Sequence, residues 1–360
     1  MGFTQELLQW FSTHGRILPW RDDPNPYHVW VSEVILQQTR VDQGTEYYHR
    51  FLANFPTISA LANAPLDAVM KLWEGLGYYT RARNLHKAAQ IVMEKYHGQL
   101  PNSYSALRTL PGLGDYAAGA VASFAFKEPV PAIDGNVYRV LARVYGIFES
   151  PGKAQGKKIF RELCLELIDK TSPHRFNQAL IDFGALQCTP GKPDCQVCPF
   201  LGECYAQQNA LQLKLPTKER TLKIRPRHLN FLMLRHGNST FIERREKKDI
   251  WHSLYQFPLI ETTNDLTFAE LAKLHDVQEL LGQNYTLLCT SPVKHQLLSH
   301  QELFIHFYII ALHEPTYALR YRYRRVPIQD MHSYQVPISI RNYLVADEAA
   351  RYFLHPDDEQ

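Results

Sequence analysis

The sequence predicts an all-α domain with a cysteine-rich loop, followed by a smaller α+β domain. Three observations carry this prediction. Apolar residues recur at helical spacing up to about residue 205, short runs rich in aromatic and β-branched residues follow from about residue 228, and four of the six cysteines lie within residues 188–204. A chain of 360 residues is too long for one ordinary core, so we expect two domains or three.

The first domain, residues 1–208, is expected to consist of short helices. Their connections are brief and carry proline and glycine, as in PNP at 24–26 and LPNS at 100–103. The apolar periodicity places helices at residues 4–14, 28–38, 43–54, 65–74, 80–96, 115–126, 135–147, 156–171 and 176–187.

Residues 209–227 are predicted to form a basic interdomain linker. The segment LKLPTKERTLKIRPR, at 213–227, carries six Lys and Arg residues against one Glu, with two prolines and no apolar stripe. Such a run is either a solvated charged segment or a linker that also contacts phosphates. More widely, residues 151–250 hold 18 Lys and Arg against 10 Asp and Glu, which is typical of a surface that meets a polyanion.

The second domain, residues 228–345, is predicted to be α+β, and residues 346–360 to be a polar C-terminal tail. One helix is expected at 268–282, where FAELAKLHDVQELLG carries a helical apolar stripe. Strands are expected at residues 228–234, 239–245, 254–260, 285–291, 304–312 and 318–326.

Two features of the sequence bear on its compartment. No run of about 18 apolar residues occurs, so no membrane span is expected. The N-terminal segment MGFTQELLQWF lacks the basic lead and the cleavage site of a signal peptide. We therefore expect a reducing compartment, cytosolic or nuclear.

The cysteine spacing is the strongest motif in the chain. Cys188, Cys195, Cys198 and Cys204 follow the pattern C-x6-C-x2-C-x5-C. In a reducing compartment, four clustered thiols indicate either a zinc site or a [4Fe–4S] cluster rather than disulfides. Zinc sites usually show two tight pairs, so the single tight pair here favours iron–sulfur and leaves zinc open. Lys192 lies at the tip of the loop, where it could meet a phosphate.

The stretch LPGLGDY, residues 110–116, predicts a helix–hairpin–helix. Gly112 and Gly114 permit a tight turn, and the following helix would present its unpaired N–H groups and the positive end of its dipole. A DNA phosphate fits that end without sequence being read. A glycine-rich corner between two helices, with no ligand, is the alternative.

Two carboxylates are candidates for acid–base chemistry. Glu33 lies among apolar neighbours in VWVSEVILQQT, and burial there would favour the protonated form that a general acid requires. Asp134 begins a predicted helix, where a capping aspartate accepts backbone N–H bonds and stays ionised. One protonated and one ionised carboxylate is the pair that glycosidic cleavage uses. An outward-facing glutamate and a purely structural N-cap are the alternatives.

Together these motifs resemble the adenine DNA glycosylase (MutY) family of the helix–hairpin–helix DNA glycosylase superfamily. The resemblance is dense over about residues 1–210 and looser over 228–345, which is similar to that family's Nudix-like C-terminal domain. The residues that carry it are LPWR (18–21), WVSEVILQQTRV (30–41), LWEGLGYYTRARNLHKAA (72–89), LPGLGDYAAGAVASFAF (110–126), IDGNVYRVLAR (133–143) and the four cysteines.

The resemblance implies a base excision repair enzyme that removes adenine mispaired with 8-oxoguanine or guanine in double-stranded DNA, with a bound [4Fe–4S] cluster. It implies that Glu33 protonates the base, that Asp134 stabilises an oxocarbenium-like sugar and that Asn136 is a polar partner in the same pocket. Further implied positions are Trp20 and Arg21 in the adenine pocket, and Gln38, Leu76 and Tyr78 in the base stack after the adenine is flipped out. We expect a monomer in the cytoplasm, associated with the bacterial nucleoid.

The family's C-terminal domain recognises 8-oxoguanine, and the matching loop here is KHQLLSHQ, 294–301. Leu298, Ser299 and His300 occupy the place where the family usually shows Phe-Ser-His, so the leucine weakens a stacking contact while the other two supply hydrogen bonds. Without the resemblance, a polar loop between strands would be the simpler interpretation. A metal-binding Nudix helix carries an Arg-Glu pair followed by a Glu-Glu pair, and this domain shows no such run. We therefore expect no nucleotide pyrophosphatase activity.

Tyr116 distinguishes the leading hypothesis from an alternative. A bifunctional lyase resembling endonuclease III would need a lysine two residues after Gly114, where this chain has Tyr116. The tyrosine cannot form a Schiff base, although its hydroxyl can hydrogen-bond Glu33 or the sugar. A further alternative is a non-catalytic iron–sulfur protein that binds DNA or senses redox state, against which the retained Glu33 and Asp134 argue.

Overall fold

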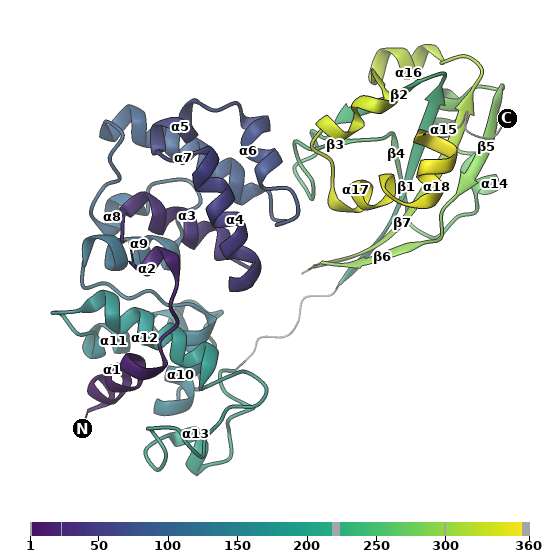
Figure 1. Cartoon of the computed structure of the whole chain (residues 1–360). Helices are drawn as coiled ribbons and strands as arrows, with labels where there is room; N and C mark the ends of the chain where they lie inside the picture. The colour runs from purple at the N-terminus through teal and green to yellow at the C-terminus, as the bar shows by residue number, and fades with distance from the viewer. Residues whose placement is uncertain (1, 23, 218–223, 299, 355–360) are drawn as a thin grey trace. The chain divides into compact units, whose positions relative to one another are not determined.

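The computed structural model describes residues 2–22, 24–217, 224–298 and 300–354. The chain divides into two compact units, residues 1–221 and 222–360. The first is helical and the second is built on a sheet (Figure 1). The predicted fold class, an all-α domain followed by an α+β domain, is therefore confirmed. None of the helices in the described part of the chain is long and apolar enough to cross a membrane.

The first unit contains only helices and connecting turns among its described residues. The helices are α1 (Phe3–His14), α2 (Pro19–Asp22), α3 (Pro26–Leu36), α4 (Val41–Asn54), α5 (Ile58–Asn63), α6 (Leu66–Leu72), α7 (Thr80–Tyr96), α8 (Tyr104–Leu107), α9 (Asp115–Phe126), α10 (Gly135–Tyr145), α11 (Ala154–Leu167), α12 (Pro173–Leu186) and α13 (Tyr205–Gln208). The nine expected helices are present, and α8 is the helix that the predicted helix–hairpin–helix requires before LPGLGDY. The short helices α2, α5 and α13 were not expected, because so few residues carry too little periodicity.

Helix α3 lies in the centre of this unit and packs against α4 and α9. Asn25 caps it by accepting a hydrogen bond from the Tyr27 N–H, and Pro26 occupies its first turn, where no N–H partner is needed. Helix α9 offers it small side chains, and a Cβ added at Gly119 would lie 2.5 Å from the Pro131 carbonyl oxygen. Every residue of α3 from Val29 to Ile35 is buried.

The second unit is built on one eight-stranded mixed sheet. Its strands are β1 (Arg225–His236), β2 (Ser239–Arg244), β3 (Tyr255–Gln256), β4 (Leu259–Thr262), β5 (Tyr285–Thr290), β6 (Lys294–Leu297), β7 (Gln301–Leu312) and β8 (Arg324–Pro327). The main order is β3-β2-β1-β7-β5, with β4 on β1, β6 on β7 and β8 on β2. The two long strands β1 and β7 are parallel neighbours, with Leu229 opposite Ile305.

Helices cover both faces of the sheet. Successive residues of β1 and β7 point to opposite faces, and apolar side chains lie on each face, so both faces must be buried. Phe231 and Phe307 point to a face covered by η1 (Ile328–Ser333), α17 (Ile338–Leu344), α18 (Asp347–Ala349) and η2 (Ala350–Leu354). Leu232 and Tyr308 point to the other face, covered by α14 (Phe268–Leu271), α15 (His275–Leu281) and α16 (Tyr317–Arg322).

Two secondary-structure predictions in this unit are wrong. The helix expected at 268–282 is two helices, α14 and α15, because Leu274 has an extended backbone that starts the second one. The strand expected at 318–326 is helix α16 followed by β8. Thr316 caps α16 by accepting from the Leu319 N–H, and the alternating Tyr and Arg residues had resembled a strand pattern.

The segments at the borders of the second unit also differ from expectation. The polar tail expected from residue 346 is helical up to residue 354, and Ala349 and Phe353 are buried in the core. The expected linker ends early, because residues 225–227 already pair with β7. The expected polar loop 294–301 begins as strand β6, since Lys294 to Leu297 pair with β7.

Candidate active site

Glu33 is buried inside the first unit, with 6% of its surface exposed. The Tyr116 hydroxyl, from the second position of α9, donates a hydrogen bond to its carboxylate. Burial raises the pKa of Glu33 to about 7, the negative charge of Asp134 adds to this, and the Tyr116 hydrogen bond and the Arg21 and Arg16 charges oppose it. A carboxylic acid that keeps its proton near neutral pH can act as a general acid.

Two arginines near Glu33 are held by a buried aspartate. Asp182 of α12 has no exposed surface, and its side chain accepts from Arg16 Nε and Arg21 Nη2, both at 2.9 Å, and from Arg21 Nη1 at 2.8 Å. Arg21, which was expected in the adenine pocket, donates to Asp182 through both Nη atoms. Sequence reasoning missed Arg16 and Asp182, although an aspartate in the apolar run QALIDFGAL required a buried partner.

Asp134 caps helix α10 as expected. Its side chain accepts from the N–H groups of Asn136 and Val137, both at 2.9 Å, and from Asn136 Nδ2 at 2.7 Å. Burial raises the pKa of Asp134, and these hydrogen bonds oppose the rise. Capping therefore does not determine the ionisation of Asp134 alone, because burial also acts on it. Unlike Glu33, however, Asp134 lies at a helix N-terminus, which stabilises its anion.

Two arginines of α10 bind the cysteine-rich loop. Arg139 joins the Asn136 side chain (2.7 Å) to the carbonyl oxygen of Cys188 (2.7 Å). Arg143 donates to Cys188 Sγ at 3.3 Å and to the Thr189 carbonyl oxygen at 2.8 Å. The loop is therefore fastened to the helix that Asp134 caps.

The four cysteines line one cavity together with Arg143 and Phe200. Within the described part of the chain, no three of their sulfur atoms lie within 4.8 Å of one another. Four thiolates around one zinc would stand about 3.8 Å apart, because each Zn–S bond is about 2.3 Å. The sulfur atoms are therefore spread more widely than a single zinc ion needs, which fits a multi-iron cluster better, whereas four sulfur donors by themselves would suit either centre. Cys164, outside this loop, is buried in α11.

Two of the three residues expected in the base stack are exposed at tight turns. Gln38 and Tyr78 both have left-handed backbones, with φ of 61° and 47°, and Tyr78 is 53% exposed. Leu76, the third of these residues, is only 8% exposed. Trp20 is also buried, with its ring edge-to-face on Tyr48.

Arg81 joins these two turns and was missed by sequence reasoning. Its buried Nη1 donates to the Val34, Ile35 and Gln37 carbonyl oxygens at the end of α3, and to Thr39 Oγ1. Its Nη2 donates to the carbonyl oxygens of Leu76 (3.1 Å) and Gly77 (3.2 Å). One guanidinium thus holds the turn that carries Gln38 and the turn that carries Tyr78 together.

We expect Arg81→Met to slow adenine release from duplex DNA at least ~10-fold and to lower the free energy of unfolding by about 2 kcal/mol, because several buried carbonyl oxygens lose their donor. Single-turnover kinetics and thermal melting measure the two effects. Arg50→Met is the matched control, since Arg50 is exposed and also donates to a backbone carbonyl. A substrate whose adenine is already unpaired should depend less on the turns that Arg81 holds. An equal loss of rate on that substrate would contradict the role of Arg81 in positioning those turns.

The hairpin between α8 and α9 is exposed at its tip. Gly112 has φ of +83°, and a Cβ there would lie 2.8 Å from the Asn84 Cβ, so the turn requires glycine. Gly114 caps α9 with nothing within 4 Å of an added Cβ, which leaves room for a ligand at that helix end. Lys192 is likewise exposed on the cysteine-rich loop.

The expected lesion-recognition residues lie at the turn between β6 and β7. Leu298 is half-buried against the core of the second unit, while Leu297 beside it is 62% exposed, so Leu297 is the apolar residue at the surface of this turn. His300 is exposed, and its carbonyl oxygen accepts from the Arg225 N–H. Ser299 lies outside the residues that the structure describes.

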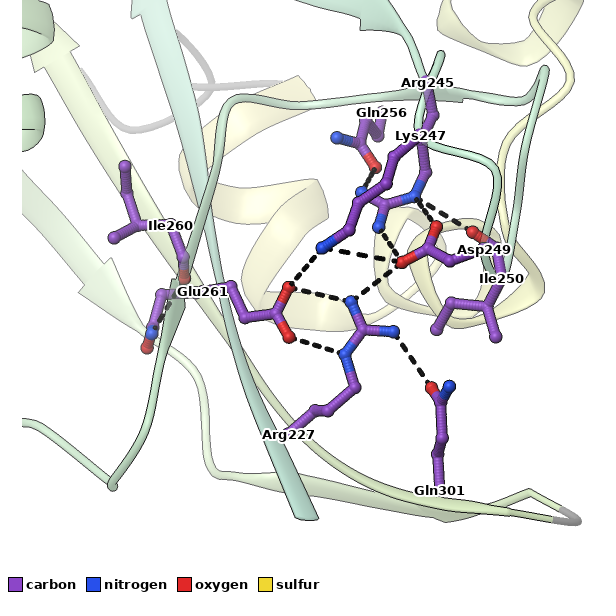
Figure 2. Close-up of polar contacts among 10 residues, drawn as sticks. Arg227, Arg245, Lys247, Asp249, Ile250, Gln256, Ile260, Glu261 and Gln301 are labelled. Carbon is purple, nitrogen blue, oxygen red and sulfur yellow. Dashed lines mark hydrogen bonds and ion pairs between the residues drawn. The ribbon is translucent and has the colours of Figure 1, made fainter. Parts of the chain in front are cut away.

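An ionic network around the buried Arg227 and Arg245 fixes the start of β7 (Figure 2). Arg227 donates to Glu261 Oε1 (2.6 Å), to Asp249 Oδ2 (3.0 Å) and to Gln301 Oε1 (2.9 Å), and Arg245 shares Asp249. Arg227 holds the pKa of Glu261 down at about 2. Because Gln301 directly follows His300, this network fixes one end of the turn.

Two family models match the two units. Residues 31–166 match the HhH-GPD superfamily of base excision DNA repair proteins, and residues 230–346 match the NUDIX domain. The chain is 40% identical over 270 residues to the adenine DNA glycosylase of Buchnera aphidicola subsp. Baizongia pistaciae (strain Bp), covering 73% of this chain and 75% of that relative. The chain belongs to the adenine DNA glycosylase family.

Other relatives agree with membership in the adenine DNA glycosylase family. The adenine DNA glycosylase of Rattus norvegicus is 42% identical over 222 residues, which are 59% of this chain and 43% of the rat protein. Among solved structures, a thermostable thymine-DNA glycosylase is similar with a TM-score of 0.53 and 27% identity, over 57% of this chain and 95% of that one. A trapped endonuclease III–DNA intermediate, with a TM-score of 0.51, 24% identity and cover of 58% and 95%, shares the fold.

Proposed function

We propose that this member of the adenine DNA glycosylase family removes adenine paired with 8-oxoguanine or guanine in duplex DNA, as a base excision repair enzyme. The observation that carries the proposal is the buried Glu33, with a pKa of about 7, in an electrostatic environment shared with Asp134. Family membership supplies the reaction class, and this pair of carboxylates supplies the chemistry.

The two carboxylates would have different roles, one as an acid and one as an anion. Adenine is a poor leaving group until a ring nitrogen is protonated, and Glu33 is the acid that can do so. Departure of the base leaves positive charge on the deoxyribose, and Asp134, stabilised by the N-terminus of α10, is the anion that can balance it. Asn136 holds Asp134, and the Tyr116 hydroxyl holds Glu33.

DNA binding would use the exposed turns of the first unit. Gly112 and Gly114 permit a phosphate to approach the N-terminus of α9, and Lys192 offers a second phosphate contact. Gln38, Leu76 and Tyr78 would fill the space that the flipped adenine leaves in the base stack. We further infer a monomer that works at the nucleoid.

A [4Fe–4S] cluster would be held by Cys188, Cys195, Cys198 and Cys204. The wide spacing of the sulfur atoms supports this assignment over zinc, and the single tight pair in C-x6-C-x2-C-x5-C agrees with it. When bound, the cluster supplies a rigid cross-link for the loop rather than reaction chemistry. Arg139 and Arg143 carry that rigidity to the helix capped by Asp134.

Tyr116 favours simple hydrolysis over the lyase alternative. A Schiff-base enzyme needs a lysine amine beside the reacting sugar, and here the equivalent position carries a tyrosine engaged with Glu33. The product would be an abasic site in an intact strand.

The choice of opposite base is assigned to the turn at 298–300. We expect His300→Ala combined with Ser299→Ala to reduce the preference for 8-oxoguanine:adenine over guanine:adenine by roughly 10-fold, since each lost hydrogen bond to a buried partner costs about 0.5–1.5 kcal/mol. Single-turnover rates on duplexes that differ only in the base opposite adenine measure this. His313→Ala, an exposed histidine elsewhere on the second unit, is the control. An unchanged preference would place lesion recognition elsewhere.

A further inference from the structure

Helix α16 exposes two stacked tyrosines. Tyr317 and Tyr321 are 81% and 80% exposed, and their rings lie nearly parallel with centroids 6.0 Å apart. Leu319 alone anchors the helix, since it is fully buried against the sheet. Neither tyrosine therefore contributes to the core, and their flat faces are available to a ligand.

Arginines surround the tyrosine pair. The segment YALRYRYRRVP, residues 317–327, carries four arginines and no acidic residue, and Arg320, Arg322, Arg324 and Arg325 are all exposed. Glu279 pairs with Arg322 at 3.1 Å, and Arg325 contacts His236 Nδ1 at 3.1 Å. The ion pair with Glu279 leaves a net excess of arginines on this segment, so the surface is positive.

A polar hollow of about 610 Å³ adjoins this surface. Strand β8 pairs with β2, placing Arg324 opposite Ile242, and α16 lies beside β2 in Figure 1. The charged side chains lining the hollow are Arg244, Arg245, Lys247, Arg322 and Arg324, with Glu243 and Glu246. Of these acids, Glu243 already accepts a hydrogen bond from Gln256. Among the cations, Arg245 is already bound by Asp249, which does not line the hollow.

We propose that α16, β8 and the adjoining hollow form a second nucleic-acid site, which binds single-stranded DNA. Exposed aromatic faces stack on unpaired bases, and the surrounding arginines bind the phosphates that connect them. Duplex DNA hides its base faces and would use only the arginines. The site contains none of the residues assigned to adenine release, so it extends the enzyme's contacts to a strand outside the substrate duplex.

The test uses the full chain and a fluorescein-labelled oligo(dT), which contains no adenine. Anisotropy should report binding that persists when unlabelled substrate duplex has already saturated the enzyme. Tyr317→Ala with Tyr321→Ala should weaken oligo(dT) binding at least ~10-fold, because each stacked base contributes about 1–3 kcal/mol. Arg320→Ala with Arg324→Ala should lower the slope of log affinity against log salt by about 1.4, or about 0.7 for each lost phosphate contact.

Two controls accompany the variants. Arg351→Ala removes an exposed arginine next to Phe353, whose side chain packs on the opposite face of the sheet, and should leave oligo(dT) binding unchanged. The single-turnover rate of adenine release should be equal in the wild type and in the tyrosine variant, which shows that the variant is folded. The proposal is overturned if neither variant changes oligo(dT) affinity, if substrate duplex displaces oligo(dT) completely, or if the tyrosines instead mediate self-association seen by light scattering.

Discussion

Glu33→Gln should abolish adenine release from an 8-oxoguanine:adenine duplex while the protein still binds that duplex. The amide has the shape of the acid but no proton to give, so the leaving base stays unprotonated, and the loss should be at least ~10²-fold in single-turnover rate. The wild-type rate should fall as the pH rises above about 7, because ionised Glu33 cannot donate.

The same variant should be more stable than the wild type in alkali. Burial raises the pKa of Glu33 from an ordinary value of 4.5 to about 7, so folding disfavours its ionised form. The cost is absent below about pH 4.5, accumulates as the pH rises, and is complete above about pH 7, where 2.5 pKa units correspond to about 3 kcal/mol. Glu33→Gln should therefore raise Tm at about pH 8 and leave it unchanged at about pH 4.

Glu46→Gln, an exposed glutamate in the same unit, is the matched control and should change neither rate nor Tm. Substantial turnover by Glu33→Gln would assign the acid to another residue. If the variant is inactive but no more stable than the wild type at alkaline pH, then the ionised form of Glu33 is not disfavoured by folding, and its pKa is not raised by burial.

The second large effect is expected at the cysteine-rich loop. Cys198→Ser replaces a thiolate by a hydroxyl, a poor ligand for iron, and should lose most of the roughly four irons per chain that a [4Fe–4S] cluster supplies. Without the cluster the loop should lose its ordered conformation, and with it the hydrogen bonds from Arg143. Tm should therefore fall by roughly 10 °C, and activity should fall as well.

Iron analysis, visible absorption and thermal melting measure these changes. Cys289→Ser, in the second unit, is the control, and this variant should contain as much iron as the wild type. Colourless wild-type protein that contains one zinc would contradict the cluster assignment, and full iron content in Cys198→Ser would remove Cys198 from the ligand set.

Helices with local signals were predictable from sequence alone. Helix α9 begins and ends where predicted, because Gly114 and the alanine-rich run act within a few residues. Burial of Glu33 was predictable too, since its apolar neighbours lie on all sides of α3. Its hydrogen bond with Tyr116 was anticipated only through the comparison with the lyase position, because no local pattern joins two residues so far apart in sequence.

The missed features depend on distant partners. Asp182 and Arg16 are 166 residues apart, and no local pattern predicts their ion pair. Arg81 donates to carbonyl groups, which every residue carries, so composition gives no sign of it. In α16, alternating Tyr and Arg indicated a strand, but the cap at Thr316 and the single buried residue Leu319 favour a helix.

The most direct test of the central claim is an assay of the purified full chain on a duplex with one 8-oxoguanine:adenine pair. Free adenine, strand breaks with and without alkali, and covalent trapping by borohydride should be measured together. We predict adenine release, strand breaks only after alkali and no trapped adduct, because Tyr116 replaces the Schiff-base lysine. Breaks without alkali together with a trapped adduct, or no adenine release at all, would contradict the account.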